Sequence, residues 1–247
     1  MQIVKPSFKV MRGLDRDVIP FLEECGRTCY KSEDLITPMS ASKFVSGIVK
    51  SKHESVIEHA SITVRIVGSR SMTHQLVRHR IASYSQESQR FVNYSKDKHG
   101  SEIVFIDPMF KVEGKRYTYE QYEKLFDHYS GNNEDAPQEF MHMFKAYTHF
   151  EENCRMVENE YMEIVEECFV NPEDARELLP NSCKTEIVIT ANLRVWRHIF
   201  AERAVNNKAQ FQIRYLTQGI LKEFNAVLPE IFGDIVDTID KNNGWVV

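Results

Sequence analysis

The chain has 247 residues, of which 42% are hydrophobic and 27% are charged, and its formal net charge is −5. This composition allows a buried core and excludes a chain that is disordered by composition, while the acidic balance argues against a general nucleic-acid-binding protein. No apolar run approaches the roughly 18 residues of a membrane-spanning helix, and the first residues lack a signal-peptide core, so a cytoplasmic protein without membrane partners is expected.

Strands and helices are predicted to alternate in the first half of the chain. Apolar residues at alternate positions predict strands at 3–11 and 60–67, and a short strand at 103–106. Helical spacing predicts helices at 18–29, 41–51 and 70–80. In the last of these, Met72 and Leu76 would face the core. The polar stretch 83–88 is interpreted as a loop.

One long helix, at 137–169, is the clearest element of the sequence. It follows residues 95–135, which are rich in Lys, Tyr, Gly and Asn and are interpreted as an insertion. Its apolar positions alternate spacings of three and four, a heptad rhythm that predicts packing along its length against another helix, either internal or from a second subunit. These positions are Phe140, Met143, Tyr147, Phe150, Cys154, Val157, Tyr161, Ile164 and Cys168.

The remaining elements complete a prediction of the fold class. A short helix is expected at 172–178, a strand at 185–190, and helices at 193–203 and 208–224. Strands interspersed with helices predict an α+β (mixed α/β) fold, with an antiparallel or mixed sheet flanked by helices and one long helix. Residues 1–247 are predicted to form a single domain with an insertion at about 95–135.

Two stretches carry excess positive charge in this acidic chain. Residues 70–90 contain four arginines and two histidines but one acid. Residues 194–214 contain four arginines, one lysine and one histidine, again with one acid. This pattern indicates a confined site for a small polyanion, although two solvated helix faces would give the same pattern.

The densest functional signal is the run Arg78-His79-Arg80. Three consecutive basic residues cannot share one helix face, so the run is predicted to lie where a helix ends and its side chains can surround a ligand. Arginine pairs well with phosphate oxygens and carbonyl edges, and the Ser and Gln side chains that follow suit a nucleobase. A capped helix end with solvated arginines is the alternative interpretation.

The run also carries a resemblance to a known family. Arg78-His79-Arg80, followed after seven residues by Ser88, matches the RHRx7S signature of flavin-dependent thymidylate synthases. Upstream, HESVIEH at 53–59 and GRTCY at 26–30 resemble further family segments. Downstream, the elements ARELLP, NLR, Arg203 and Ala209-Gln210 recur in family order, so the resemblance spans about 20–94 and 172–226.

This resemblance implies a methyltransferase that converts dUMP to dTMP. In such an enzyme 5,10-methylenetetrahydrofolate is the carbon donor, FAD is the cofactor, and NADPH is the reductant. The family builds each site from several subunits of a homotetramer, so a homotetramer is expected here. Folate-only thymidylate synthases use a cysteine nucleophile. None of the five cysteines lies in a basic, polar setting that would favour a thiolate, except Cys29 near Arg27 and Lys31, which agrees with a flavin route.

Roles for individual residues follow from the resemblance. Arg203 would be the catalytic residue, lying against the uracil ring and favouring the negative charge that develops there. His53 would lie at the edge of the folate and flavin. The residues expected to bind dUMP are Gln75, Arg78, Gln86, Glu87, Ser88, Gln89, Arg90, Arg176 and Arg203. Those expected to bind FAD are Ser55, Arg78, His79, Arg80, Gln86, Asn192, Arg194 and His198.

The chain departs from the family pattern at a few positions, and two rival functions remain open. Ser85-Gln86 stands where the family has Asn-Glu, and His198 where it often has Asn. A non-catalytic nucleotide-binding protein that has lost flavin is therefore the first alternative. The second is a metal-dependent hydrolase using His53 and His59, although lone histidines are more often structural and no metal is expected.

Overall fold

The computed structural model describes residues 1–96, 100–129 and 137–247, which form two compact units. Of the predicted insertion at 95–135, residues 97–99 and 130–136 lie outside the described residues. We call the first unit the long-helix unit; it comprises Met1–Pro6, Gly68–Ser71 and Glu87–Thr185. The second, the sheet unit, comprises Ser7–Val67, Met72–Gln86 and Glu186–Val247.

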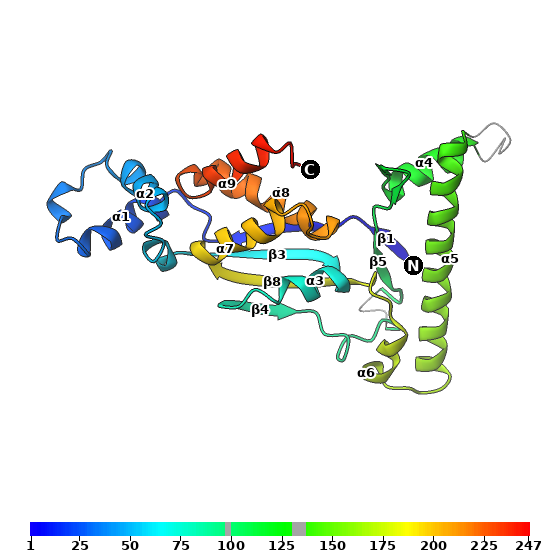
Figure 1. Ribbon diagram of the computed structural model, residues 1–247. Helices are drawn as coiled ribbons and strands as arrows, with labels where there is room; N and C mark the ends of the chain where they lie inside the picture. The colour runs from blue at the N-terminus through cyan, green and yellow to red at the C-terminus, as the bar shows by residue number, and fades with distance from the viewer. Residues whose placement is uncertain (97–99, 130–136) are drawn as a thin grey trace. The chain divides into compact units, whose positions relative to one another are not determined.

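A four-stranded sheet organises the sheet unit (Figure 1). Its order is β2-β3-β8-β4, with β2 antiparallel to β3 and β4 antiparallel to β8. Along β3 and β8 alternate side chains are buried, as the period of two in a strand requires. The strands are β2 (Ser7–Arg12), β3 (Ser61–Ser69), β4 (Ala82–Gln86) and β8 (Lys184–Asn192).

Helices bury the apolar side of this sheet. Figure 1 shows α7 and α8 running along it, and Gly219 lets α8 approach β2, because a Cβ there would lie 2.7 Å from the ring of Phe8. The helices are α1 (Val18–Thr28), α2 (Ala41–Lys50), α3 (Arg70–Leu76), α7 (Leu193–Phe200), α8 (Phe211–Val227) and α9 (Pro229–Lys241). Shorter 3-10 turns lie at η1 (Glu33–Leu35) and η2 (Val56–His59), and a π-helical turn follows α7 at Ala201–Val205.

The long-helix unit contains the 29-residue helix α5 (Gln138–Glu166). Two short strands, β1 and β5, pair in parallel, and β6 and β7 form a hairpin. The remaining elements are β1 (Gln2–Val4), β5 (Val104–Ile106), β6 (Lys111–Val112), β7 (Lys115–Arg116), α4 (Tyr119–Tyr129), α6 (Pro172–Ala175) and the 3-10 turn η5 (Arg176–Leu178).

The apolar stripe of α5 is buried, but its partner changes along the helix. Met143 and Tyr147 pack in an aromatic cluster with Tyr122 of α4, as a helix partner predicts. Cys154 and Tyr161 instead pack in a cluster that includes residues of β5 and α6. The second half of the stripe therefore packs on strand and loop residues as well as on the short helix α6, and the last stripe position, Cys168, is exposed.

Three predicted elements need correction. The predicted strand 3–11 is two strands, because Pro6 lies between β1 and β2 and has no N–H to donate to a ladder. The predicted loop 83–88 contains β4, a polar strand held by its backbone pairing to β8 at the sheet edge. The predicted helix 70–80 ends at Leu76, so the basic run 78–80 does lie beyond a helix end.

The other elements agree with the sequence in kind. Helices were predicted close to the observed bounds of α1, α2, α5 and α7, and strands close to those of β3, β5 and β8. Helix α8 begins at Phe211 rather than 208, and α4 and α9 were not predicted. Among the described residues no helix is long and apolar enough to cross a membrane.

Candidate active site

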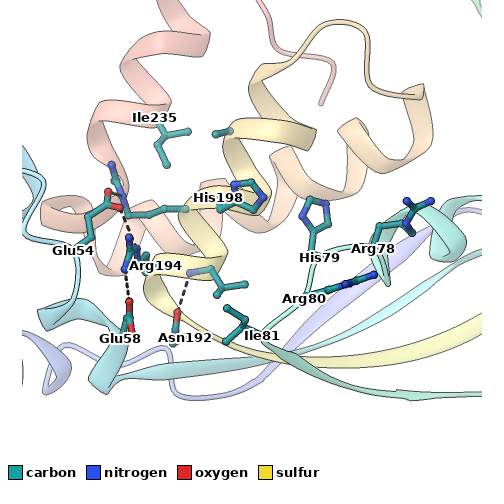
Figure 2. Close-up of a pocket in the computed structure, with 13 residues that line it drawn as sticks. Glu54, Glu58, Arg78, His79, Arg80, Ile81, Asn192, Arg194, His198 and Ile235 are labelled. Carbon is teal, nitrogen blue, oxygen red and sulfur yellow. Dashed lines mark hydrogen bonds and ion pairs between the residues drawn. The ribbon is translucent and has the colours of Figure 1, made fainter.

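The sheet unit contains a pocket of about 830 Å³ that is lined in part by the segment Arg78–Ile81 and by helix α7 (Figure 2). Its walls come from four places in the sequence: the segment around η2, the turn after α3, helix α7 and helix α9. Six of the residues predicted to bind FAD line it, namely Arg78, His79, Arg80, Asn192, Arg194 and His198.

The three side chains of the basic run Arg78–Arg80 differ in how deeply they are buried. Arg78 and Arg80 are exposed at the pocket, whereas His79 is only 6% exposed. Ile81, which follows the run, has a φ of 65°, a left-handed conformation that is strained for a β-branched residue. Such strain costs on the order of 1–3 kcal/mol and is typical of functional sites. This turn therefore places two cations at the pocket and one imidazole behind them.

His79 is held as a neutral hydrogen-bond acceptor. Its Nε2 accepts a hydrogen bond from Nε of Arg203 at 2.9 Å, and its ring meets that of His198 edge-on at 5.4 Å. Burial, then the charge of Arg203, then His198 lower the pKa of His79 to about 4. Because Nε2 accepts, the proton of the neutral ring belongs on Nδ1.

The predicted catalytic residue Arg203 lies on the π-helical turn Ala201–Val205. Besides its bond to His79, its guanidinium donates to the backbone carbonyl of Gln75 at 3.5 Å. The residue is half-buried. π-helical turns are rare and occur mostly at functional sites, where they change the direction of a side chain.

The opposite wall of the pocket is built from ion pairs. Arg194 pairs with Glu58 at 2.5 Å and lies 3.7 Å from Glu54. Arg197 donates to Glu54 at 3.2 Å and makes two parallel 2.7 Å hydrogen bonds to Asp234 of α9. Two parallel hydrogen bonds between a guanidinium and a carboxylate are the strong geometry for such an ion pair. Together these pairs connect α7 to the η2 segment and to α9.

Asn192 determines where α7 begins. Its side-chain oxygen accepts a hydrogen bond from the backbone N–H of Val195 at 2.9 Å, which caps the helix. The pocket lining then holds four arginines against two glutamates, with His79 neutral. A surplus of positive charge in a concave site favours an anionic ligand such as a diphosphate.

Known proteins resemble the chain over nearly its whole length. A family model described as thymidylate synthase complementing protein matches residues 19–230. A flavin-dependent thymidylate synthase of Mycolicibacterium vanbaalenii is 33% identical over 216 residues, covering 86% of this chain and 78% of the relative. One from Geobacter sulfurreducens is 35% identical, covering 84% and 78%.

The chain belongs to the flavin-dependent thymidylate synthase family.

Solved structures agree with this fold. A UMP/dUMP methylase from Streptomyces cacaoi, bound with 5-bromo-dUMP, has a TM-score of 0.69 at 16% identity and covers 98% of this chain and 97% of its own. Thymidylate synthase X from Helicobacter pylori, with FAD and dUMP, has a TM-score of 0.63 at 18% identity and covers 93% and 98%. At this identity the likeness concerns the fold, which confirms the predicted α+β class.

Four other predicted residues lie in the sheet unit outside this pocket's lining. Gln75 offers its backbone carbonyl to Arg203, and Gln86 of β4 donates to the hydroxyl of Thr73 at 2.9 Å. Ser55 is exposed at the start of η2. His53 is also exposed and lines a second pocket of about 430 Å³, together with Arg27, Ser40, Lys43, Phe44, Gly47, Ile48 and Ser51.

Five residues that the thymidylate synthase resemblance assigns to dUMP belong to the long-helix unit. Glu87 accepts from the hydroxyl of Tyr94 at 3.0 Å and pairs with Lys184 at 3.3 Å. Ser88 accepts from the backbone N–H of Arg90 at 3.3 Å, and the Arg90 guanidinium pairs with Glu173 at 2.5 Å.

The other two residues of this group offer polar atoms that a ligand could use. Arg176 is exposed and lies 3.8 Å from the carboxylate of Glu177. The side-chain nitrogen of Gln89 is buried without a hydrogen-bond partner among the described residues, apart from the Cys183 thiol, a weak acceptor. A buried unpaired donor is costly, so a ligand that accepts from it would stabilise the site.

Sequence reasoning missed part of the pocket wall. Arg197 was treated only as a member of a basic stretch, and Asp234 and Ile235 lie on the unpredicted helix α9. The signal was present, because Pro229 at a helix start and apolar residues at helical spacing after it predict a helix. Among the described residues, no three His, Cys, Asp or Glu side chains cluster as a metal site requires.

Proposed function

We propose that this chain methylates dUMP to dTMP, with 5,10-methylenetetrahydrofolate as carbon donor, FAD as cofactor and NADPH as reductant. The observation that carries the proposal is the gathering of six residues of the family's flavin set around one positively charged pocket. The relatives named as flavin-dependent thymidylate synthases, at 33% and 35% identity, support the same activity.

The residues around the pocket fit FAD. Arg78, Arg80 and Arg194 offer guanidinium groups suited to a diphosphate. Ile81, Val195, Ala201 and Ile235 supply apolar lining against which a flat ring system can pack. When bound, reduced flavin supplies the hydride and mediates transfer of the methylene carbon.

Arg203 is proposed to act on the uracil ring of dUMP. A guanidinium stays protonated at any working pH, so it stabilises negative charge developing on the ring without giving up a proton. His79 accepts from Nε and the Gln75 carbonyl accepts from one terminal nitrogen, so the remaining N–H groups of the two terminal nitrogens would be the ones that meet substrate. Neutral His79 adds no further positive charge behind Arg203.

The remaining assignments concern substrate binding and assembly. We propose that Arg90 and Arg176 bind the phosphate of dUMP, while Gln75, Arg78, Gln86, Glu87, Ser88 and Gln89 contact its other parts. Ser55 and Gln86 would contact FAD, and His53 would lie at the folate edge. We further propose a cytoplasmic homotetramer in which several subunits complete each site.

A visible absorption spectrum of the purified protein tests the function first. The protein, supplied with FAD, should show flavin bands that bleach under NADPH, faster when dUMP is present, and dTMP should form when methylenetetrahydrofolate is added. A protein that takes up dUMP but no FAD would refute the proposal in favour of a non-catalytic nucleotide-binding protein. That alternative rests on Gln86, which is neutral where the family has Glu.

A further inference from the structure

The π-helical turn that carries Arg203 ends in a buried backbone carbonyl. The turn stops at Val205, and Ala204 is only 1% exposed. At a helix end the last carbonyls have no partner within the helix, and a buried carbonyl without a partner is costly. The direction of the peptide after Arg203 therefore depends on a group from elsewhere in the chain.

Gln218 of α8 supplies that group. Its side-chain nitrogen donates to the carbonyl of Ala204 at 2.9 Å, and the whole residue is fully buried. The same nitrogen donates to the carbonyl of Gly244 at 2.8 Å, and its oxygen accepts from the N–H of Val246 at 2.7 Å. Three hydrogen bonds thus fix the orientation of one buried amide.

The segment Gly244–Val246 is itself attached to the helices. The indole N–H of Trp245 donates to Asp240 of α9 at 2.5 Å, and the ammonium of Lys222 lies 4.7 Å from the Trp245 ring centroid. The segment therefore holds the same side-chain amide that donates to Ala204, and the amide cannot rotate without breaking bonds to both.

We infer that Gln218 is a positioning residue for Arg203: it fixes the π-helical turn so that the guanidinium points at His79, and the segment Gly244–Val246 completes this support. On one side Arg203 is bonded to His79 and Gln75. On the other, the peptide that follows it is held by Gln218. The expected loss of kcat when Gln218 is replaced rests on the proposed role of Arg203. The expected displacement of the Arg203 side chain does not.

The test compares two substitutions of adjacent buried residues on α8. Gln218→Met keeps the size and removes all three bonds. Thr217→Val is the matched control, because among the described residues the Thr217 hydroxyl bonds only to carbonyls of its own helix, those of Ile213 and Arg214. Both substitutions are expected to lower stability. Only Gln218→Met should lower kcat for dTMP formation, by about tenfold, with flavin affinity within about twofold of wild type.

A second readout needs no bound ligand. The titration of His79 can be followed by NMR, and its pKa of about 4 depends partly on the charge of Arg203, with His198 as the other titratable group facing it. When Arg203 swings away in Gln218→Met, the pKa of His79 should rise towards its ordinary value of about 6.5. Thr217→Val should leave it unchanged.

A folded Gln218→Met protein with wild-type kcat and an unchanged His79 titration would overturn the inference. If that variant does not fold, Val246→Pro carries the same test, because it removes the N–H that donates to Gln218 and leaves Gln218 itself unchanged. It should lower kcat about threefold and shift the His79 titration in the same direction, and no change in either would refute the support. A wild-type protein without dTMP formation would remove the proposed function, while the titration would still report on Gln218.

Discussion

Each of the two units of the chain contains a buried polar side chain, but the two side chains serve different purposes. In the sheet unit, buried His79 accepts from Arg203, a half-buried residue. In the long-helix unit, Asp107 is 1% exposed and accepts from the N–H groups of Met109 and Tyr119, both at 2.8 Å, and from the hydroxyl of Tyr147 at 3.0 Å.

The comparison shows how one kind of buried contact can serve chemistry or folding. The bonds to Asp107 all come from backbone and side chains that surround the aromatic cluster of α4 and α5, so they are consumed inside the unit. The bond to His79 instead joins a residue of the pocket lining to the guanidinium of Arg203. Substitution of Arg203 should therefore lower activity, whereas substitution of Asp107 should lower stability. The two largest expected effects test that division, and two smaller ones sharpen it.

The largest effect is expected from Arg203→Ala. Loss of the guanidinium should lower kcat for dTMP formation by about a thousandfold or more, the magnitude of losing a preorganised group that stabilises developing charge. Flavin should remain bound, because the pocket lining does not include Arg203. Single-turnover kinetics and the flavin spectrum measure both. Full activity of Arg203→Ala would refute the assigned role, and Arg203→Lys should recover only part of the loss.

The second effect is one of stability. Asp107→Ala leaves two backbone N–H groups and the Tyr147 hydroxyl without their acceptor in a buried site, and should lower the free energy of unfolding by about 3 kcal/mol. Chemical denaturation measures this change. Flavin affinity should stay the same, since the substitution lies in the long-helix unit.

Tyr147→Phe is the matched control for Asp107. The Tyr147 hydroxyl donates both to Asp107 and to the carbonyl of Tyr117, at 3.0 and 2.6 Å. Its removal leaves the two backbone donors of Asp107 satisfied, so the loss should be only about 1–2 kcal/mol. Equal losses in the two variants would contradict the view that Asp107 organises this cluster.

The third effect depends on pH. The folded state holds the pKa of His79 at about 4, whereas an unfolded chain binds the proton near pH 6.5. Between these values the unfolded state binds more protons, so the free energy of unfolding falls as pH drops from about 6.5 towards 4 and this contribution is fully lost below that. At pH 5 the expected loss relative to pH 7 is about 2 kcal/mol.

His79→Gln isolates this contribution, because glutamine can still accept from Arg203 but does not titrate. Other groups also destabilise proteins in acid, so the difference between wild type and His79→Gln is the quantity to measure by denaturation at each pH. If both proteins lose stability in parallel, His79 is not the group that responds.

Elements that bury one apolar face were predicted better than polar elements, and the reason is physical. Strands β3 and β8 bury one face against helices, so alternation such as Ile62, Val64 and Ile66 is visible in the sequence. Strand β4 is polar and is held by backbone hydrogen bonds to β8. Such bonds do not require a hydrophobic pattern, so the sequence does not reveal the strand. Periodicity likewise revealed the stripe of α5 but not the nature of each partner along it.

The site was predictable where a motif is local and not where contacts are distant. Arg78-His79-Arg80 could be placed at a helix end because three adjacent cations cannot share a helix face. The bond from Arg203 to His79 joins residues 124 positions apart, and the pairing of Arg197 with Asp234 joins two helices. Neither spacing has a regular period, so only the folded chain brings these partners together.

The smallest effect concerns two exposed arginines of the long-helix unit proposed to bind the dUMP phosphate. The Arg90 guanidinium pairs with Glu173 at 2.5 Å, with side chains 59% and 45% exposed, whereas Arg176 lies 3.8 Å from Glu177, which is 82% exposed.

Glu173→Gln removes a carboxylate that competes with phosphate for Arg90, so the KM for dUMP should fall about twofold, with stability changed by less than about 0.5 kcal/mol. Glu177→Gln is the control and should change neither, because a distant, solvated carboxylate competes weakly. A rise in KM for Glu173→Gln would instead mean that Glu173 holds Arg90 in its binding position, which would make this ion pair part of the phosphate site rather than a competitor for it.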